Sequence, residues 1–443
     1  MSSRALHLSH APIARTVPAS FTMSIRENLV LSRAASRVLA TLSGPQRDAV
    51  LESIADALDA NVSTILAHNA QDMARARESG MGEAMLDRLR LDPARVHVMA
   101  ESVRDVASLA DPLGELREMG TRPNGLRICK RRVPLGVLAV VYEARPNVTV
   151  ECAALAIKSG NALVLRGGRE ALESNRALAK IVRDALAQAK APMDAVLFID
   201  DTSRERVAEL LGATGLVDLC IPRGGASLMA MVDEHARVPV IRHGQGICHV
   251  FVDASAPREM AAAILVNAKT QRPGVCNAAE TWLVHQAVLQ DSGDAFAFIA
   301  RALCDAGVTL HCDARAHAAL TASKIACVPA EPEDWDREFL SLDLAVRVVD
   351  SLDEALAHIA KHGSEHTAAI VTGDPDAGER FLREVTASCV LLNASTRFND
   401  GGQLGLGAEI GISTSRMHAW GPMGLRELTA EKFVVYGDGH TRP

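Results

Sequence analysis

The sequence lacks any apolar run of the roughly 18 to 20 residues that a membrane-spanning helix needs. It also lacks a long basic run, and its net charge is −7 at pH 7. Its one dense basic patch, Lys130-Arg131-Arg132, is interpreted as a solvated edge ahead of a strand. A chain with this charge pattern has little electrostatic attraction for nucleic acid or an anionic lipid surface. We therefore expect neither nucleic acid nor a membrane as a partner.

The sequence has no CxxC pair, and its nine cysteines are irregularly spaced. Scattered cysteines in a long chain favour a reduced, cytoplasmic protein over a disulfide scaffold. Cys304, His311, Cys312 and His317 match no standard zinc spacing, so we expect no metal site.

Residues 1–22 contain no aspartate or glutamate and hold two prolines. A transit peptide can have this composition, but the segment has neither a continuous apolar core nor a clear amphipathic helix. We expect a disordered extension, or a misassigned start with Met23 as the true first residue.

The remaining chain begins with helical patterns, which give way to alternating strands and helices. Residues 24–42, 92–110 and a segment from Ser43 to about Ala76 show helical spacing, and Ser43 with Gln46 forms a capping box. From 136 to 253 apolar strands alternate with helices, a pattern that builds a parallel sheet with helices on both faces. A second α/β run starts near Ser255, and the final strand, EKFVVYG, could pair with another subunit.

Two glycine loops follow predicted strands, Leu165-Arg166-Gly167-Gly168-Arg169 and Ile221-Pro222-Arg223-Gly224-Gly225. Glycines at the carboxyl end of a parallel strand let a phosphate approach the backbone and the next helix. Each loop alone could be only a tight turn, but two such loops with arginines favour a phosphorylated cofactor. Arg166 and Arg169 suit the extra phosphate of NADP better than the free ribose hydroxyl of NAD.

Cys276 lies in the stretch AKTQRPGVCNA, between a helical segment and a β-like run. It follows Pro-Gly, so we place it on a turn, and we expect Lys269 and Arg272 to favour its thiolate. Cys152, Cys220, Cys248 and Cys327 lie in apolar runs and are interpreted as core. A cysteine near a dinucleotide site suggests attack on an acyl carbon followed by hydride exchange with a nicotinamide. Asn147, after the first long buried strand, could supply an oxyanion amide or be an ordinary turn residue.

Three long motifs carry a family resemblance: YEARPNVTVECAALAIKSGNALVLRGGREALESN, AKTQRPGVCNAAETWLVH and LNASTRFNDGGQLGLGAEIGISTSRMHAWGPMGLRELT. They resemble the gamma-glutamyl phosphate reductases, a branch of the aldehyde dehydrogenase superfamily, and the likeness covers nearly everything from Met23 onward. The resemblance implies NADPH-dependent reduction of L-glutamyl 5-phosphate to L-glutamate 5-semialdehyde through a cysteine thioester, in proline biosynthesis. It also implies a homo-oligomer and a functional hand-off of substrate from glutamate 5-kinase.

The resemblance implies residue roles as well. Cys276 falls on the nucleophile and Asn147 on the oxyanion amide. The positions that fall on the cofactor-binding elements are Arg166, Gly167, Gly168, Ser174, Arg223, Gly224, Gly225 and Glu338. Ser395, Thr396 and Arg397 are our candidates for substrate binding, on charge and loop position alone.

The implied fold class is α/β and aldehyde-dehydrogenase-like, with a parallel-sheet cofactor domain, an α/β catalytic domain and β arms. The expected ranges are 23–115 and 135–262 for the NADP-binding domain, 263–395 for the catalytic domain, and 116–134 and 396–443 for oligomerisation arms. One departure from the family pattern is Trp420, where an arginine is usual.

Two rival functions stay open at this stage. One is an aldehyde dehydrogenase that hydrolyses its thioester to an acid. The other is a nucleotide-binding regulatory or scaffold protein that has lost its catalytic activity. Hydrolysis needs a base to activate water, and the corresponding stretch, Arg242 to Cys248, has no carboxylate. His243 could serve as that base instead, because neutral imidazole is available near pH 7.

Overall fold

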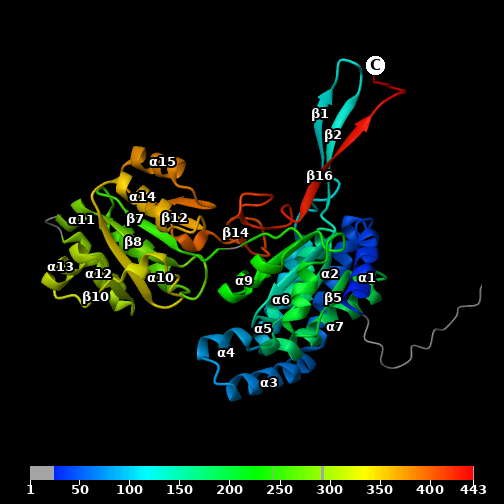
Figure 1. Ribbon diagram of the computed structural model, residues 1–443, viewed down its shortest axis with the longest axis horizontal. Helices are drawn as coiled ribbons and strands as arrows, with labels where there is room; N and C mark the ends of the chain where they lie inside the picture. The colour runs from blue at the N-terminus through cyan, green and yellow to red at the C-terminus, as the bar shows by residue number, and fades with distance from the viewer. Residues whose placement is uncertain (1–23, 243, 291–293, 443) are drawn as a thin grey trace, which may run out of the picture.

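The computed structural model describes residues 24–242, 244–290 and 294–442, so the predictions for residues 1–22, Met23 and His243 lie outside the described residues. The described chain forms two lobes joined by extended crossings, with a narrow arm that projects from the first lobe (Figure 1). No helix among the described residues has the length and apolar character needed to cross a membrane.

The first lobe is built on a four-stranded parallel sheet in the order β5-β4-β3-β6. Its strands are β3 (Val137–Tyr142), β4 (Ala162–Arg166), β5 (Val196–Phe198) and β6 (Leu219–Arg223). Every residue of β3 is buried, which confirms the prediction of a strand covered on both faces.

Helices cover both faces of this sheet, and α3 and α4 pack outside this layer, with α3 against α7. The helices of the lobe are α1 (Ile25–Leu39), α2 (Gly44–Ala60), α3 (Val62–Glu78), α4 (Glu83–Leu89), α5 (Pro93–Ser108), α6 (Pro146–Lys158), α7 (Leu172–Gln188), α8 (Arg204–Leu211) and α9 (Ala226–His235). Leu138 and Val140 of β3 share a core with α2, α5, α6 and α7, whereas Val137 and Ala139 share a core with α1, α8 and α9. Alternate side chains of β3 therefore pack into two separate cores, one on each face of the sheet.

The segment from Ser43 to about Ala76 is helical as predicted, but it divides at Asn61 into α2 and α3. Asn61 leaves helical geometry at φ −113° and ψ 19°, and its side-chain amide donates to the Ala57 carbonyl at 2.7 Å. An asparagine side chain that binds nearby backbone competes with the helical ladder. The capping interaction is present, since the Ser43 N–H donates to Gln46 Oε1 at 2.8 Å.

The second lobe holds a seven-stranded parallel sheet in the order β10-β9-β11-β8-β7-β12-β13. Its strands are β7 (Cys248–Val252), β8 (Ala279–His285), β9 (Thr309–Cys312), β10 (Val328–Pro329), β11 (Asp343–Val349), β12 (Thr367–Val371) and β13 (Cys389–Leu392). Its helices are α10 (Arg258–Thr270), α11 (Gln286–Gln290), α12 (Ala295–Asp305), α13 (Ala314–Ala322), α14 (Leu352–His362) and α15 (Pro375–Glu384).

The second sheet starts earlier in the chain than the expected boundary at residue 263. β7 pairs with β8 and β12, so the chain enters this sheet at Cys248. Residues 238–242 form no regular strand, and among them only Val240 bridges to Cys220. Pro239 has no N–H to donate to a ladder, which disfavours a regular strand there.

The arm is an antiparallel sheet of β1 (Leu116–Thr121), β2 (Arg127–Pro134) and β16 (Thr429–Tyr436), in the order β1-β2-β16. Its hairpin spans the residues for which the first arm segment is expected. The second expected arm segment, 396–443, lies only partly in the arm. Its residues Ile410, Met423 and Leu428 pack instead in the core of the first lobe. β16 itself pairs with β2 of its own chain.

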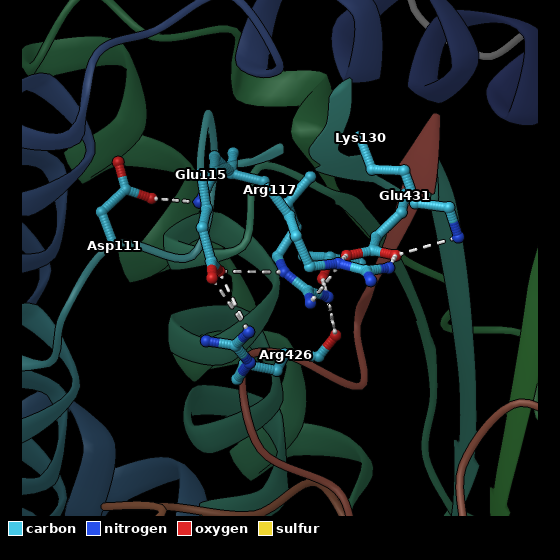
Figure 2. Close-up of polar contacts among 9 residues, drawn as sticks. Asp111, Glu115, Arg117, Lys130, Arg426 and Glu431 are labelled. Atoms are coloured by element: carbon cyan, nitrogen blue, oxygen red, sulfur yellow. Dashed lines mark hydrogen bonds and ion pairs between the residues drawn. The ribbon is translucent and has the colours of Figure 1, made fainter. Parts of the chain in front are cut away.

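Ion pairs tie the three arm strands together near the base (Figure 2). The Glu431 carboxylate on β16 lies 2.8 Å from Arg117 Nη2 and 3.3 Å from Lys130 Nζ. Hydrogen bonding to Arg117 is the largest cause that holds the pKa of Glu431 at about 2. Glu115 lies 3.0 Å from Arg426 Nη2. The contacts hold the three strands to one another, although each exposed pair contributes little stability on its own.

Trp420, the departure from the family pattern, is partly exposed beyond a two-stranded ladder of β14 (Ile412–Ser413) and β15 (Gly421–Pro422). The Arg416 guanidinium lies 4.8 Å from the centre of its ring. This cation–π contact gives the tryptophan a local structural partner.

Candidate active site

Cys276 lies in the turn that joins α10 to β8, as the sequence predicts. The Ala278 N–H donates to the Val275 carbonyl at 3.0 Å and closes the turn. Of the nine cysteines, all within the described residues, Cys276 is the one classed as exposed. A residue exposed on a turn is accessible to a substrate.

The other cysteines largely follow expectation. Cys152, Cys220 and Cys248 are buried as predicted, whereas Cys327 is only partly buried. Among the described residues, no group of three or more histidine, cysteine, aspartate or glutamate side chains is placed to hold a metal ion.

The structure corrects the expectation that nearby cations favour the Cys276 thiolate. Burial of the sulfur among loop atoms raises the pKa of the thiol to about 11, and the charges of Glu409 and Glu338 raise it further. Arg223 and Arg145 lower the pKa, but by less than burial raises it. The thiol of the free protein is therefore protonated at neutral pH, and it must lose its proton before it attacks an acyl carbon.

Lys269 does not lower the pKa of the Cys276 thiol as expected, because its ammonium is paired with another side chain. Its ammonium lies 2.5 Å from Glu280, and both side chains are fully buried. Burial is the largest cause that raises the pKa of Glu280 to about 7. Lys269 is in the last turn of α10 and Glu280 is in β8, so the pair fixes both ends of the Cys276 turn.

The backbone of the Cys276 turn packs against the chain crossing that precedes β7. A Cβ added to Gly246 would lie 1.8 Å from the Cys276 carbonyl oxygen, so only glycine fits there. The Cys248 thiol donates to the same carbonyl at 3.1 Å. The Gly246 N–H donates to Glu338 Oε1 at 3.1 Å, which brings Glu338, predicted to contact the cofactor, to the Cys276 turn. Glu338 therefore belongs to this site.

Asn147 lies in the first turn of α6, just beyond the carboxyl end of β3. Its amide nitrogen donates to Glu151 Oε1 at 2.8 Å. An asparagine amide carries two N–H donors, so this bond can orient the group while leaving one donor for a ligand.

Arginines gather around the thiol from both lobes. Burial, followed by repulsion from Arg223, Arg88 and Arg272, lowers the pKa of Arg145 to about 10. Arg88 of α4 reaches across to donate to the Gly274 carbonyl at 2.6 Å. An excess of positive charge beside an exposed thiol suits an anionic substrate.

The three predicted substrate residues lie at a short 3₁₀ turn, Thr396–Phe398, which Ser395 directly precedes, and they differ in their surroundings. Ser395 Oγ accepts from the Arg397 N–H at 3.3 Å and caps the turn. Thr396 is fully buried. The Arg397 guanidinium reaches the Cys276 turn, where it donates to Gln271 Oε1 at 2.8 Å. Arg397 is therefore the member of this set best placed to meet a substrate.

A separate pocket of about 630 Å³ opens at the carboxyl ends of β3, β4 and β6 in the first lobe. It is lined by Glu143, Arg166, Gly168, Arg169, Glu170, Thr202, Ser203, Arg204, Val207, Ser227, Leu228 and Met231. This is the position where a doubly wound sheet binds a nucleotide.

Polar groups in this pocket fit a phosphorylated nucleotide. The Arg166 guanidinium donates to the carbonyls of Thr202 and Ser203, and its Nε is buried with no hydrogen-bond partner among the described residues. Arg169 and Arg204 have exposed side chains on the rim. Two of the acidic groups are engaged with backbone, since Glu143 accepts from the Gly225 N–H and Glu170 from the Ala144 N–H. The cations thus stay available for phosphate.

Not every predicted cofactor residue lines the pocket. Ser174 is buried and its hydroxyl donates to Asp72 Oδ2 at 2.6 Å, so it anchors α7 to α3. Arg223 turns the other way, toward the Ile410 carbonyl and Cys276. Gly224 lies against Glu143, and Gly225 precedes α9, whose Ser227 and Leu228 line the pocket.

Sequence reasoning missed Arg145, Arg204, Glu143 and Glu409 as site residues. Arg145 and Glu143 belong to the quoted motif YEARPN, so their position after a buried strand was a usable signal. Glu409 also belongs to a quoted motif, but neither it nor Arg204 directly follows a buried strand, and only the folded chain brings the start of α8 to the pocket and the 409 loop to the thiol.

Comparison with known proteins agrees with this geometry. Residues 9–314 match the aldehyde dehydrogenase family. The chain is 52% identical over 411 residues to a gamma-glutamyl phosphate reductase of Anaeromyxobacter sp. (strain K), covering 93% of this chain and 96% of that protein. It is 51% identical to the one of Thermobifida fusca (strain YX), covering 94% and 98%. It also resembles the crystal structure of gamma-glutamyl phosphate reductase from Thermotoga maritima, with TM-score 0.90 and 42% identity over 94% of this chain and 99% of that one.

An exposed cysteine between two α/β lobes, a nucleotide pocket on the first lobe and sequence likeness along almost the whole chain lead to one assignment. The chain belongs to the gamma-glutamyl phosphate reductases, within the aldehyde dehydrogenase family.

Proposed function

We propose that this protein reduces L-glutamyl 5-phosphate to L-glutamate 5-semialdehyde with NADPH, releasing phosphate, through a thioester on Cys276. The reaction serves proline biosynthesis in the cytoplasm, with substrate handed on from glutamate 5-kinase. The observation that carries the proposal is the exposed Cys276 thiol flanked by Arg145 and Arg223. An acyl phosphate with a carboxylate is strongly anionic, so it matches this excess of positive charge.

The residues of this chain divide the reaction between them. The Cys276 thiolate attacks the acyl carbon, and Asn147 donates to the oxygen on which negative charge develops. The bond from that carbon to the phosphate oxygen breaks, and phosphate leaves with the bonding electron pair. NADPH, when bound, supplies hydride to the thioester carbon. The resulting thiohemiacetal collapses to aldehyde and restores the Cys276 sulfur.

The cofactor is proposed to occupy the first-lobe pocket, with Arg166, Gly168 and Arg169 near its phosphates and Glu338 at the nicotinamide end. Members of the aldehyde dehydrogenase family use NAD or NADP. Arg166 and Arg169 favour NADP because they can bind its additional phosphate.

Substitution of the nucleophile tests the proposal directly. Cys276→Ser should fold normally and lose turnover, because an alcohol ionises far less than a thiol near neutral pH. The assay follows NADPH oxidation after glutamyl phosphate is added, with Cys304→Ser as the control, since Cys304 lies in α12 of the second lobe. Near-normal turnover by Cys276→Ser would show that another group forms the thioester or that no thioester forms.

A further inference from the structure

Arg145 has an unusual place beside the nucleophile. It immediately precedes α6, at the carboxyl end of β3, two residues before Asn147. β3 pairs with β6 so that Tyr142 is opposite Arg223, and the Glu143 N–H donates to the Arg223 carbonyl at 3.2 Å. Two arginines therefore extend from neighbouring strand ends on the same edge of the sheet.

The Arg145 guanidinium differs from most others in what surrounds it. Within residues 24–242, 244–290 and 294–442, no side chain or backbone group forms a hydrogen bond or ion pair with it, although the residue is half-buried. Arg47, a fully buried arginine of α2, shows the usual alternative: it donates to the carbonyls of Lys158 and Leu42 and pairs with Asp111. Arg145 thus differs from a structural arginine.

An unpaired guanidinium in this place costs free energy that an anion would recover. Arg145 is partly removed from water and faces the like charges of Arg223, Arg88 and Arg272. Among the described residues no counterion compensates this charge, so the arrangement does not stabilise the fold. Uncompensated charge of this kind gathers at binding sites.

The position favours a phosphoryl group over the other anionic end of the substrate. The phosphoryl group is bonded to the carbonyl that Cys276 attacks, so it must lie close to the sulfur. Arg145 acts on that sulfur and stands at the start of a 13-residue helix, whose N-terminus favours anions. Arg397 contacts Gln271, farther along the Cys276 turn, and is therefore better placed to bind the α-carboxylate.

We propose that Arg145, with Arg223 beside it, forms the subsite for the phosphoryl group of the acyl phosphate and for the inorganic phosphate that it becomes. The identity of the acyl substrate rests on the proposed function, whereas the oxyanion subsite rests on the geometry alone. Arginine suits this task because its planar fork can donate two parallel hydrogen bonds to phosphate.

Protection of Cys276 from alkylation by iodoacetamide measures the subsite without any turnover. Inorganic phosphate should slow alkylation of the wild-type protein, because a bound anion covers the sulfur and disfavours its thiolate. In Arg145→Gln the phosphate concentration for half-protection should rise at least about tenfold, the loss expected for a charged hydrogen-bond pair. Arg77→Gln, an exposed arginine of α3, is the matched control and should leave protection unchanged.

A parallel series with L-glutamate separates the two anionic ends of the substrate. Arg145→Gln should lose phosphate protection and keep whatever protection glutamate gives. Loss of glutamate protection with phosphate protection intact would assign Arg145 to the α-carboxylate and overturn the proposal. Failure of phosphate to protect the wild-type protein would overturn it as well.

Two further points keep the test decisive. Should Arg145→Gln fail to fold, Arg145→Met keeps a long apolar stem and is judged by the same criterion. The proposed function has its own readout, since its failure would appear as absent NADPH oxidation with glutamyl phosphate while Arg145-dependent phosphate protection persisted.

Discussion

Cys276 is the proposed nucleophile, and its surroundings explain both what sequence could predict and what it could not. Its position after Pro-Gly predicts a turn and exposure, and both are confirmed. The acidity of its thiol was not predictable, because Lys269 is paired with Glu280 rather than directed at the sulfur. Charges close in sequence need not be close to the group that they are expected to activate.

Alkylation of Cys276 by iodoacetamide should rise about tenfold for each pH unit from 7 to 10, because thiolate is the reactive form and burial raises the pKa to about 11. Mass spectrometry of the peptide that contains Cys276 follows the rate, with the buried Cys220 as an internal reference. Arg223 lowers the pKa of the thiol, so Arg223→Gln should move the profile to higher pH. A plateau below pH 9 would contradict a raised pKa.

Arg166 and Arg169 carry the prediction of cofactor preference. Replacing both with alanine should weaken NADPH binding and spare NADH, because only NADPH brings the additional phosphate for these guanidiniums. Fluorescence titration of each nucleotide measures the two affinities, with Arg77→Ala as the control in the same lobe. Equal losses for both nucleotides would show that these arginines do not recognise that phosphate.

At the level of elements, the pattern of apolar residues was the most informative feature of the sequence. The apolar run of β3 and the boundaries around the α10–β8 turn follow from local composition. The break at Asn61 did not, because it depends on a side chain that bonds to the backbone. The place of β7 in the second sheet also could not be read locally, since strand pairing is decided by which partners the folded chain brings near.

The contact between Gly246 and the Cys276 turn gives an element-level prediction. Gly246→Ala should lower kcat by about 10² or more, because the added carbon forces the Cys276 carbonyl, and with it the sulfur, out of position. Circular dichroism and thermal unfolding check that the fold persists. Gly82→Ala, where an added carbon meets nothing within 4 Å, is the control and should be near wild type. Unchanged kcat in Gly246→Ala would mean that the turn tolerates displacement.

For the whole molecule, the site is a product of tertiary structure. Arg145 and Arg223 come from the first lobe, Cys276 and Arg397 from the second, and no local pattern predicts that they meet. The arm exposes Phe433 by 65%, together with Val435 and Tyr436. An apolar surface of this kind is typical of an interface, and a homo-oligomer formed through the arm stays a prediction.

The acyl acceptor in the backward reaction tests the central assignment most directly. The enzyme is supplied with glutamate 5-semialdehyde and NADP, with and without phosphate, while NADPH and glutamate are followed together. A reductase of an acyl phosphate should form NADPH beyond a single turnover only when phosphate is present to take the acyl group from Cys276, and it should release little glutamate without it. Rapid and sustained glutamate formation in the absence of phosphate would instead show that water takes the acyl group, and would identify the protein as a hydrolytic aldehyde dehydrogenase.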